Sequence, residues 1–346
     1  MCNFSLKVPA ALCALAFAAC APAATTTGPK APHAHGEPAA AGADGAADAE
    51  DPHAAHGHGH HGGGPIDLRQ AALPFRVLRA HGGTEVPEAD FFADLAGADA
   101  ICLGEVHPNP HHHWVQLMVV EHLVQAAQGK RSFGVGLEMF ATPFQGVLDD
   151  FVAGRIDQAA LLARTGWEER WGYDFGFYGP TIAAAVAVKG AVLALNAPRE
   201  LVHQVNTVGL DHLSASEKKA LPELDLKDDE HRAWFDRATG GHTEGDAKSA
   251  SDFYAAQVVW DETMADTATR WLKAGAKGEP PRQIAIVAGV GHCMDAAIPK
   301  RMRRRGVGRT VSVQAVLDDG GSGVSDVLAS PENDYVIVLD ASGGAK

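Results

Sequence analysis

Cysteine is scarce in this sequence, with 5 residues in 346. Cys2 and Cys13 lie within the first 19 residues, Cys20 follows them, and only Cys102 and Cys293 remain in the rest of the chain. So few cysteines exclude a small fold that depends on several disulfides. Cys102 and Cys293 each lie beside one of the two main motifs described below. We expect a buried pair of thiols there, with a disulfide as the alternative in an oxidising compartment.

Positive charge is also in short supply. Lys and Arg number 29 against 43 Asp and Glu, which gives a formal net charge of −14 at pH 7. A nucleic-acid-binding surface needs an excess of basic side chains, so we expect no nucleic-acid partner. The longest basic run, residues 300–305, is interpreted as a helix end, where cations interact favourably with the helix dipole.

The apolar run at residues 8–19 is too short to span a bilayer and predicts a secretion signal. Residues 17–20 read Phe-Ala-Ala-Cys, which resembles the bacterial lipobox, in which the cysteine is lipidated after cleavage. We therefore expect a lipoprotein signal peptide over residues 1–20 and a membrane anchor through lipid on Cys20. Ala21, in place of an acidic residue, favours the outer membrane, with the protein facing the periplasm. The alternative is ordinary signal cleavage a few residues later.

Residues 21–64 form a low-complexity tether rich in Ala, Gly, Pro and Asp, with too few large apolar side chains to fold. The tether contains seven histidines, among them His56, His58 and His60. Neutral imidazole binds transition metals such as zinc, copper, nickel or manganese, so the tether has the chemistry of a metal-binding tract. The alternative is a solvated linker that is rich in histidine.

From residue 65 the composition is that of a globular domain. Apolar strand-like runs alternate with helical patterns, which predicts an α/β fold with a mainly parallel central sheet flanked by helices. The expected strands are residues 99–103, 134–138, 191–195, 283–288, 311–316 and 335–339. Asn109 and Pro110 predict the cap and first residue of a helix that ends at Gly129. The helical segments at about 144–273 exceed simple crossovers, so we expect an inserted helical subdomain there.

Ionisable side chains follow several of these strands. The expected set at the strand ends is Glu105, His107, Glu138, Arg199 and His292. The carboxyl ends of parallel strands share one edge of a sheet, where ligands bind. Two histidines and two carboxylates suffice for a divalent-metal site or for acid–base chemistry. The alternative is that these side chains only cap helices and satisfy hydrogen bonds.

Three consecutive histidines, His111, His112 and His113, open the helix after the first of these strands. Successive helical residues diverge by about 100°, so the three cannot all face one ion. We expect one or two to face the cleft and at least one to be exposed to solvent.

An aromatic cluster occupies the segment from residue 167 to residue 178. Core packing is the default interpretation of such a cluster. Its mixture of Trp, Tyr and Phe with Gly also suits a flat aromatic ligand, and a tyrosine can ligate ferric haem as phenolate. Tyr178, which precedes a Gly-Pro helix start, and Tyr173 are the two candidates.

Five segments, taken together, resemble one family; they are residues 103–113, 137–140, 196–199, 257–265 and 289–292. As an ordered set they resemble the ChaN-like haem-binding lipoproteins. That family lies within a wider superfamily that includes Tiki-type metalloproteases and erythromycin-esterase-like proteins. The resemblance covers roughly residues 75–339, which is nearly all of the globular part.

The resemblance implies an α/β fold with an inserted helical subdomain, in a periplasmic lipoprotein linked to haem or iron uptake. Family members can hold pairs of haems face to face within a dimer, with tyrosine as the iron ligand. In the wider superfamily, paired Gly-x-x-His motifs and a Glu serve a metal site or acid–base chemistry. Carried over to this chain, those positions are His107, Glu138 and His292, with Glu105 and Arg199 beside them. The His-rich tether departs from the family pattern.

Three functions follow as hypotheses. The first is a lipid-anchored haem-binding protein that acts near an outer-membrane haem transporter, with a homodimer as the binding form. The second is a metal-dependent hydrolase in which a bound ion activates water and Glu138 acts as the base. The third is a metal-buffering lipoprotein that works through its tether. We favour the first and expect a binding protein rather than an enzyme.

Overall fold

The structure is a computed structural model and describes residues 66–240 and 247–342. It is built on an eight-stranded sheet with the order β2-β1-β8-β7-β3-β6-β4-β5. The strands are β1 (Phe75–Arg79), β2 (Glu85–Val86), β3 (Ala100–Glu105), β4 (Ser132–Ala141), β5 (Ala191–Asn196), β6 (Arg282–Gly289), β7 (Thr310–Asp318) and β8 (Tyr335–Asp340). All six strands expected from the sequence are present, so the mainly parallel α/β fold is confirmed.

The central strands run parallel and their carboxyl ends meet at one edge. β3 pairs in parallel with β6 and with β7, and Glu105 at the end of β3 lies opposite Gly289 at the end of β6. β4 pairs in parallel with β6 and β5. All six residues of β3 are buried, as in a strand covered on both faces.

The antiparallel edge formed by β1 and β2 was not predicted from the sequence. β1 pairs antiparallel with both β2 and β8. Arg76 and Arg79 interrupt the apolar pattern of this short strand, and both are at least partly exposed. An edge strand that needs few apolar residues gives a weak sequence signal.

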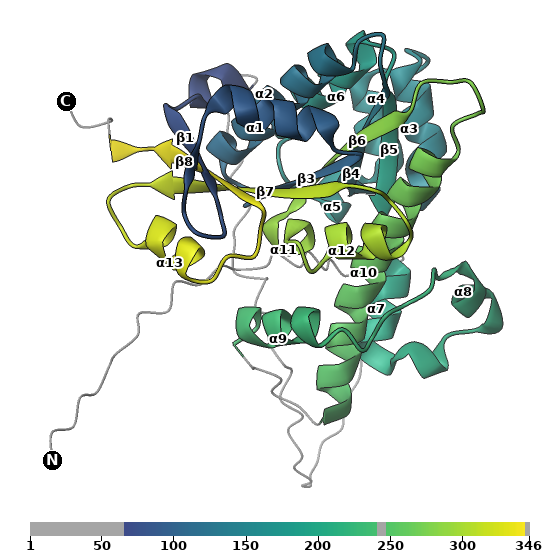
Figure 1. Ribbon diagram of the computed structural model, residues 1–346. Coiled ribbons are helices and arrows are strands. Elements are labelled where there is room, and N and C mark those ends of the chain that lie inside the picture. Colours follow the sequence, from purple (N-terminus) through teal and green to yellow (C-terminus); the bar gives the residue numbers. More distant parts are fainter. Residues whose placement is uncertain (1–65, 241–246, 343–346) are drawn as a thin grey trace, which may run out of the picture.

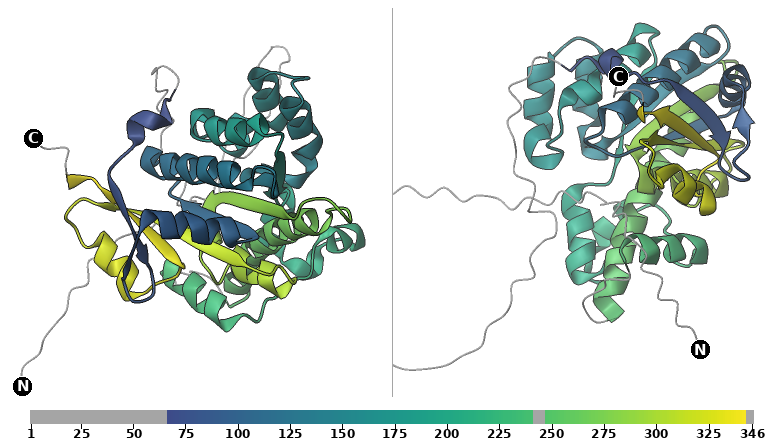
Figure 2. Two further views of the ribbon diagram at one scale, coloured as in Figure 1. Left: turned by 45° about the horizontal axis from the view of Figure 1, so that its top comes forward. Right: turned by 90° about the vertical axis from the view of Figure 1, so that its left-hand side faces the viewer.

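Helices cover both faces of the sheet (Figures 1 and 2). One face carries α1 (Glu88–Gly97), α2 (Pro110–Ala127), α3 (Gln145–Val152), α4 (Gln158–Thr165) and α6 (Gly179–Ala187). The other face carries α10 (Ala247–Lys273), α11 (Val290–Cys293), α12 (Ile298–Arg304) and α13 (Gly323–Ala329). The remaining helices are α5 (Trp167–Arg170), α7 (Arg199–Val208), α8 (Ala215–Ala220), α9 (Asp229–Ala238), η1 (Leu68–Ala71), η2 (Thr142–Phe144), η3 (Phe175–Phe177) and η4 (Leu210–His212).

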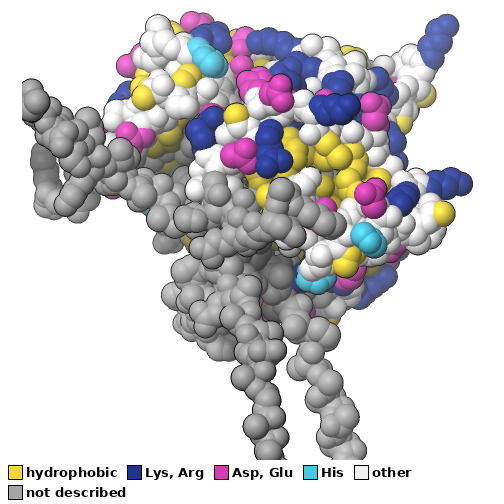
Figure 3. Space-filling model, turned by 90° about the horizontal axis from the view of Figure 1, so that it is seen from below, with side chains coloured by type: hydrophobic (Ala, Val, Ile, Leu, Met, Phe, Trp, Pro, Cys, Tyr) yellow, Lys and Arg dark blue, Asp and Glu magenta, His cyan; other side chains and the backbone are white. Residues whose placement is uncertain are grey.

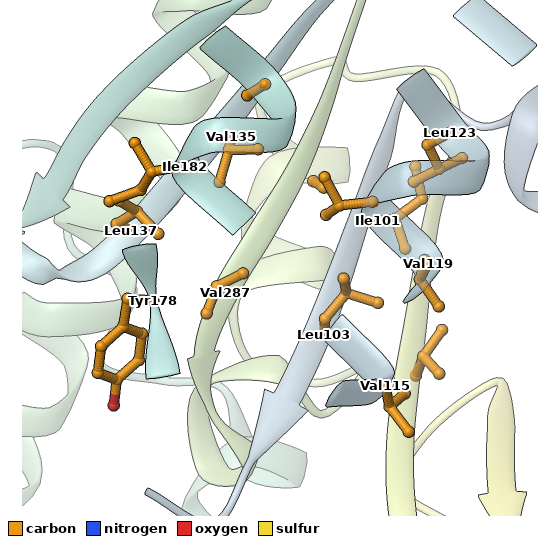
Figure 4. Packing of buried hydrophobic residues seen from close by; sticks show 14 of the residues in the cluster. Ile101, Leu103, Val115, Val119, Leu123, Val135, Leu137, Tyr178, Ile182 and Val287 are labelled. Carbon is orange, nitrogen blue, oxygen red and sulfur yellow. The ribbon is translucent and has the colours of Figure 1, made fainter. Parts of the chain in front are cut away.

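Each face of the sheet has its own hydrophobic core. Figure 4 shows the larger one, in which Ile101 and Leu103 of β3 pack against Val115, Val119 and Leu123 of α2. The opposite face of β3 contributes a second cluster with residues of β6, α10 and α12. The register of β3 therefore fixes which of its side chains face α2 and which face α10.

Helix α2 begins as predicted. Asn109 is its N-cap, with a side-chain oxygen that accepts the His111 N–H at 3.0 Å, and Pro110 is its first residue. The helix ends at Ala127, and Gly129 follows with a φ of +68°, a conformation that favours glycine.

The helices between residues 144 and 273 form two groups, because β5 separates them. The first group, α3 to α6, lies between β4 and β5 in the chain, and the second, α7 to α10, lies between β5 and β6. In Figure 1, α7 and α9 lie beside the half of α10 that extends away from the sheet, and α8 lies farther out, beyond α7. This region has small cores of its own, one around Val205 and Val259 and one around Phe235 and Tyr254.

The face seen from below in Figure 3 carries both charged and apolar side chains. Figure 3 shows basic and acidic side chains interspersed around an apolar area. Among the residues that the structure describes, no helix is both long enough and apolar enough to cross a membrane.

Candidate functional site

Four of the predicted strand-end residues lie together at the carboxyl edge of three neighbouring strands. Glu105 ends β3 and His107 follows it, Glu138 lies on β4, and His292 lies on α11 directly after β6. Since β6 is hydrogen-bonded to both β3 and β4, it brings these side chains to one place.

Glu105 is the centre of the first half of the site and is 1% exposed. Its Oε1 lies 2.8 Å from Nδ1 of His107, and its Oε2 accepts a 2.8 Å hydrogen bond from Nε2 of Gln116. The Tyr178 hydroxyl donates to Oε1 at 3.0 Å. Burial alone would raise the pKa of Glu105, but the neighbouring His113 and His107 outweigh burial and lower this pKa to about 2. Glu105 is therefore a buried carboxylate.

Glu138 and His292 form the second half. Oε2 of Glu138 accepts the Gly289 N–H at 2.7 Å, and its Oε1 lies 3.3 Å from Nε2 of His292. Nδ1 of His292 lies 2.6 Å from Oδ1 of Asp261. Burial opposes the charged form of His292, but the two carboxylates outweigh it and raise its pKa to about 10. Burial likewise opposes ionisation of Glu138, and the charge of His292 lowers its pKa overall.

His107 lies over Gly289, between the two halves. A Cβ atom at position 289 would lie 3.1 Å from Cε1 of His107 and 3.6 Å from Oε2 of Glu138. A larger residue at this strand end would therefore be in tight contact with the His107 ring, which would have to shift. Burial works against protonation of His107, but the hydrogen bond and the charge of Glu105 raise its pKa overall.

Aromatic rings cover His107. The ring centroids of Trp171 and Tyr173 lie 4.8 and 5.3 Å from that of His107. Tyr173 is half-buried, and its hydroxyl makes no hydrogen bond to a residue that the structure describes. Burial, with the charges of Glu105 and Glu138, raises the pKa of Tyr173. Val106, between Glu105 and His107, is 41% exposed, so the site reaches the surface here.

Tyr178, the other candidate tyrosine, has a different environment. The side chain is 1% exposed, packs against Trp167, and donates its hydroxyl proton to Glu105. Burial and the charge of Glu105 raise its pKa well above the usual value. The Tyr178 hydroxyl is therefore enclosed and engaged by Glu105, whereas the Tyr173 hydroxyl is not.

The three consecutive histidines are all at least partly buried, so the expectation that one is exposed was wrong. His113 stacks on Phe177 and contacts the His107 carbonyl through Nε2 at 2.8 Å. His112 accepts the Val106 N–H on Nδ1, and burial lowers its pKa to about 4. His111 contacts the Ala71 carbonyl. Because η1 and the loop after β3 cover the helix start, these rings hold the loop that carries His107.

Arg199 lies at the start of α7, and its Nη1 donates to the Glu169 carbonyl at 2.8 Å.

Four residues of the site region were not predicted from the sequence as site residues; they are Gln116, Gln257, Asp261 and His231. Gln257 and Asp261 are four residues apart on α10, and Gln257 Nε2 and Asp261 Oδ1 lie 3.1 and 2.6 Å from Nδ1 of His292. A helical spacing of four inside a matched segment was the available signal.

The pair of cysteines next to this site forms a disulfide, which corrects the expectation of two free thiols. Cys102 of β3 is bonded to Cys293 of α11, 191 residues away in the sequence. Both side chains are almost completely buried.

Comparisons with known proteins bear on the family and the fold of this chain. A family model described as haem-binding uptake, Tiki superfamily, ChaN matches residues 91–302, which is more than half of the chain. The chain belongs to this family. The predicted resemblance to ChaN-like proteins is thereby confirmed.

Among solved structures, this fold is similar to that of ChaN of Campylobacter jejuni, whose structure is described as showing cofacial haem binding. The TM-score is 0.58 with 19% identity, and the match covers 77% of this chain and 97% of that chain. A variant of the erythromycin esterase EreC in its open conformation is also matched, with a TM-score of 0.40 and 12% identity over 77% of this chain and 83% of that one. No curated protein matched the sequence.

Whether the residues at the strand edge fit haem depends on which of them has an oxygen or nitrogen atom free to bind iron. In this ChaN-family chain, the Tyr173 hydroxyl has no hydrogen-bond partner among the described residues and stands beside Trp171, an aromatic surface for a flat ring. His292 has carboxylates on both ring nitrogens, and His107 has Glu105 on Nδ1. Two atoms at this edge thus have no hydrogen-bond partner among the described residues, the Tyr173 hydroxyl and Nε2 of His107, and the hydroxyl is the one that can bind ferric iron as a phenolate.

The predicted metal set of His107, Glu138 and His292 lies together but is engaged in ion pairs. Over residues 66–240 and 247–342, no group of three or more His, Cys, Asp or Glu side chains has an arrangement that could hold a metal ion. The other expected metal ligands, His56, His58 and His60, lie outside the described residues, as does the expected lipidation site Cys20.

Proposed function

We propose that this protein binds ferric haem through Tyr173 and takes part in haem or iron uptake. The observation that carries the proposal is the half-buried Tyr173 at the strand edge, with a hydroxyl that no described residue engages, in a chain of the haem-binding ChaN family. A phenolate is an established ligand of haem iron. Haem when bound would supply the iron, and Tyr173 would supply the oxygen donor after losing its proton.

The surroundings of Tyr173 set the conditions for that step. Because burial and the charges of Glu105 and Glu138 raise the pKa of Tyr173, the free side chain is neutral at pH 7. Binding iron as phenolate then releases one proton. Haem affinity through this residue is expected to fall as the pH falls.

The test is a haem titration of the purified protein followed by its Soret absorption. Tyr173→Phe removes the donor oxygen and is expected to weaken binding by at least about tenfold, which corresponds to about 1.4 kcal/mol. Tyr335→Phe is the matched control, because it removes a hydroxyl that donates to Asp94 far from the strand edge, and it is expected to bind haem as the unaltered protein does. No Soret change in the unaltered protein, or unaltered affinity in Tyr173→Phe, would overturn the proposal.

We also propose that the protein is anchored in the bacterial outer membrane by lipid on Cys20 and faces the periplasm. The Phe-Ala-Ala-Cys segment supports this, and a disulfide between Cys102 and Cys293 fits an oxidising compartment such as the periplasm. Labelling cells with radioactive palmitate tests it. Label in the unaltered protein and none in Cys20→Ser is expected, whereas equal labelling of both contradicts it.

A homodimer is the expected haem-bound form, because cofacial binding as named for ChaN of Campylobacter jejuni places two haems against each other. The mass in solution, measured by light scattering with and without haem, tests this. A doubling with haem supports the dimer, and an unchanged monomer contradicts it. An outer-membrane haem transporter is the expected source of the haem.

A second candidate function is supported by the two carboxylate–imidazole pairs at the strand edge. Glu105 with His107 and Glu138 with His292 have the groups that acid–base hydrolysis requires. Metal analysis of protein that lacks residues 21–64, with hydrolase assays of Glu138→Gln, tests this candidate. Stoichiometric metal and a hydrolytic activity that is lost in Glu138→Gln would favour this candidate.

The His-rich tether gives the third candidate function, a metal buffer. Equal zinc affinity with and without the tether would exclude that role.

A further inference from the structure

The His-rich tether joins the described part of the chain beside the aromatic rings that cover the candidate site. Ile66 is the first described residue, and a Cβ atom added at Gly176 would lie 3.0 Å from the Cβ of Ile66. Gly176 lies in η3, three residues after Tyr173 in the chain. The chain therefore enters the fold from the tether at the same aromatic segment that carries the proposed haem ligand.

The segment that follows this entry point is fixed by packing on α2. Leu68 of η1 is 1% exposed, and Nδ1 of His111 at the start of α2 lies 2.7 Å from the Ala71 carbonyl. Burial of a leucine side chain contributes about 1.5–3 kcal/mol. The ion pair between Arg69 and Glu121 is exposed on the arginine side and adds little. The place where the chain leaves the fold toward the tether is thus held close to the site.

Five histidines of the tether lie within 13 residues of Ile66; they are His53, His56, His58, His60 and His61. A chain spans at most about 3.3–3.6 Å per residue, so His61 can lie up to about 17 Å from Ile66 and His53 up to about 45 Å. The three residues between Gly176 and Tyr173 span at most about 11 Å. The chain is therefore long enough for each of the five imidazoles to reach an iron ion held by Tyr173.

The described residues at the strand edge supply a ligand to one face of a haem only. Under the proposed haem function, on which this inference rests, Tyr173 binds the iron on one face. His107 is the other side chain at this edge with a free donor atom, and its ring centroid lies 5.3 Å from that of Tyr173. Atoms in contact are about 3.5–4.0 Å apart, so no porphyrin fits between these two rings. The second axial position of the iron is left for a ligand from elsewhere.

We propose that a histidine of residues 53–61 binds the haem iron on the face opposite Tyr173. Imidazole is a common axial ligand of haem iron. Because the tether belongs to the same chain, this binding is intramolecular, and a ligand linked in this way acts at an effective concentration in the millimolar range. Five imidazoles in one short segment give the iron several equivalent partners. The tether thereby acts on the site itself, which a separate metal buffer would not do.

This ligand has a consequence for the proposed homodimer. In a cofacial pair, the face of each haem that points away from its tyrosine meets the second haem. A tether histidine on that face occupies the same space, so binding of the histidine and pairing of the haems exclude each other. The tether therefore opposes association of two haem-loaded chains.

The first experiment identifies the nitrogen on the iron. Full-length protein labelled with ¹⁵N in histidine only is loaded with unlabelled ferric haem, and pulsed electron paramagnetic resonance then reports a ¹⁵N coupling when an imidazole is bound. We expect the coupling in the unaltered protein and none when all five histidines of residues 53–61 are replaced by Gln. The matched control is His33→Gln/His35→Gln, which alters the tether at least 31 residues before Ile66 and should keep the coupling.

The outcomes separate this inference from the haem function. A Soret band without ¹⁵N coupling in the unaltered protein overturns the tether ligand and leaves Tyr173 as the haem ligand. A coupling that persists in the fivefold variant assigns the nitrogen to a histidine outside residues 53–61 and also overturns it. Absence of a Soret band in the unaltered protein removes both proposals together.

Affinity and rescue test whether the tether supplies a ligand and nothing more. The fivefold variant is expected to bind haem about tenfold more weakly than the unaltered protein, because it loses a linked ligand. Free imidazole at about 10 mM, above the effective concentration of a linked ligand, should restore the affinity. 2-Methylimidazole, whose methyl group hinders approach to the iron, should restore it less. Equal affinity of the variant and the unaltered protein, or no rescue by imidazole, would overturn the proposal.

Light scattering of the haem-loaded proteins tests the exclusion between tether and pairing. The fivefold variant should form dimers at a protein concentration about tenfold lower than the unaltered protein, in proportion to the lost ligand. His33→Gln/His35→Gln should associate as the unaltered protein does. Equal association of the fivefold variant and the unaltered protein would show that no tether histidine occupies the open face of the haem.

Discussion

Cys102 and Cys293 form a disulfide that joins the strand of Glu105 to the helix of His292. α11 approaches β3 so closely that a Cβ atom at Gly104 would lie 3.1 Å from the Cα of Val290. The two halves of the candidate site are therefore connected covalently, directly beneath the side chains that meet there.

Removal of this disulfide is expected to destabilise the protein by about 2–4 kcal/mol, because the bond closes a long loop in the unfolded chain. The measurement is urea denaturation of the double variant Cys102→Ala/Cys293→Ala. The unaltered protein, reduced with a phosphine, retains both sulfur atoms and separates the lost bond from lost packing. Reductant should not affect the double variant. Equal unfolding free energies for the oxidised and reduced forms would contradict this expectation.

Tyr178→Phe is expected to lower the free energy of unfolding by about 1.5–3 kcal/mol, since it removes a hydrogen bond to the buried carboxylate of Glu105. Tyr335→Phe is the matched control, because its hydroxyl donates to Asp94 at 2.6 Å, far along the sheet. Both variants should lose stability, and only Tyr178→Phe should shift the NMR signals of His107. The same His107 signals in both variants would show that Tyr178 does not act on the site.

The strand edge could be located from the sequence because one rule suffices for it. Apolar runs identify parallel strands, and the carboxyl ends of parallel strands meet, so Glu105, Glu138 and His292 were expected together. The strand boundaries agree because each run is buried on both faces.

The different environments of Tyr173 and Tyr178 could not be predicted in this way. It depends on η3 and the turn before α6, which direct Tyr178 inward to Glu105 and leave Tyr173 at the edge. His231 was equally out of reach, since α9 meets α10 only through tertiary packing and no spacing connects it to His292. Local periodicity carries no information on such contacts.

Stability should decline at both ends of the pH range, for opposite reasons. The pKa of Glu105 falls from 4.5 to about 2 on folding, so its contribution is complete above pH 4.5 and is lost as the pH falls through 2. The pKa of His292 rises from 6.5 to about 10, so its contribution is complete below pH 6.5 and is lost as the pH rises through 10.

Thermal unfolding midpoints measured from pH 2 to pH 10 test this expectation. The unaltered protein should be most stable between about pH 4.5 and pH 6.5. His292→Gln should melt earlier at pH 6 and show a weaker decline between pH 6.5 and pH 10, with the acid decline retained. A variant whose alkaline decline matches that of the unaltered protein would contradict the assignment to His292.

Gly289→Ala tests the close approach of the two halves at the strand end. The added methyl group would lie 3.1 Å from Cε1 and 3.4 Å from Nε2 of His107, so the ring must move. Crowding of a well-packed position typically costs about 1–3 kcal/mol. Gly146→Ala is the control, because its added methyl meets nothing within 4 Å and a helical glycine gains up to about 1 kcal/mol on replacement by alanine. We therefore expect urea denaturation to show a loss of stability in Gly289→Ala and a gain in Gly146→Ala.

The His107 NMR signals should shift only in Gly289→Ala, and haem affinity should fall in that variant if the His107 ring supports Tyr173. Unshifted His107 signals in Gly289→Ala would mean that the loop after β3 adjusts freely, and that the contact over Gly289 does not hold the two halves in place.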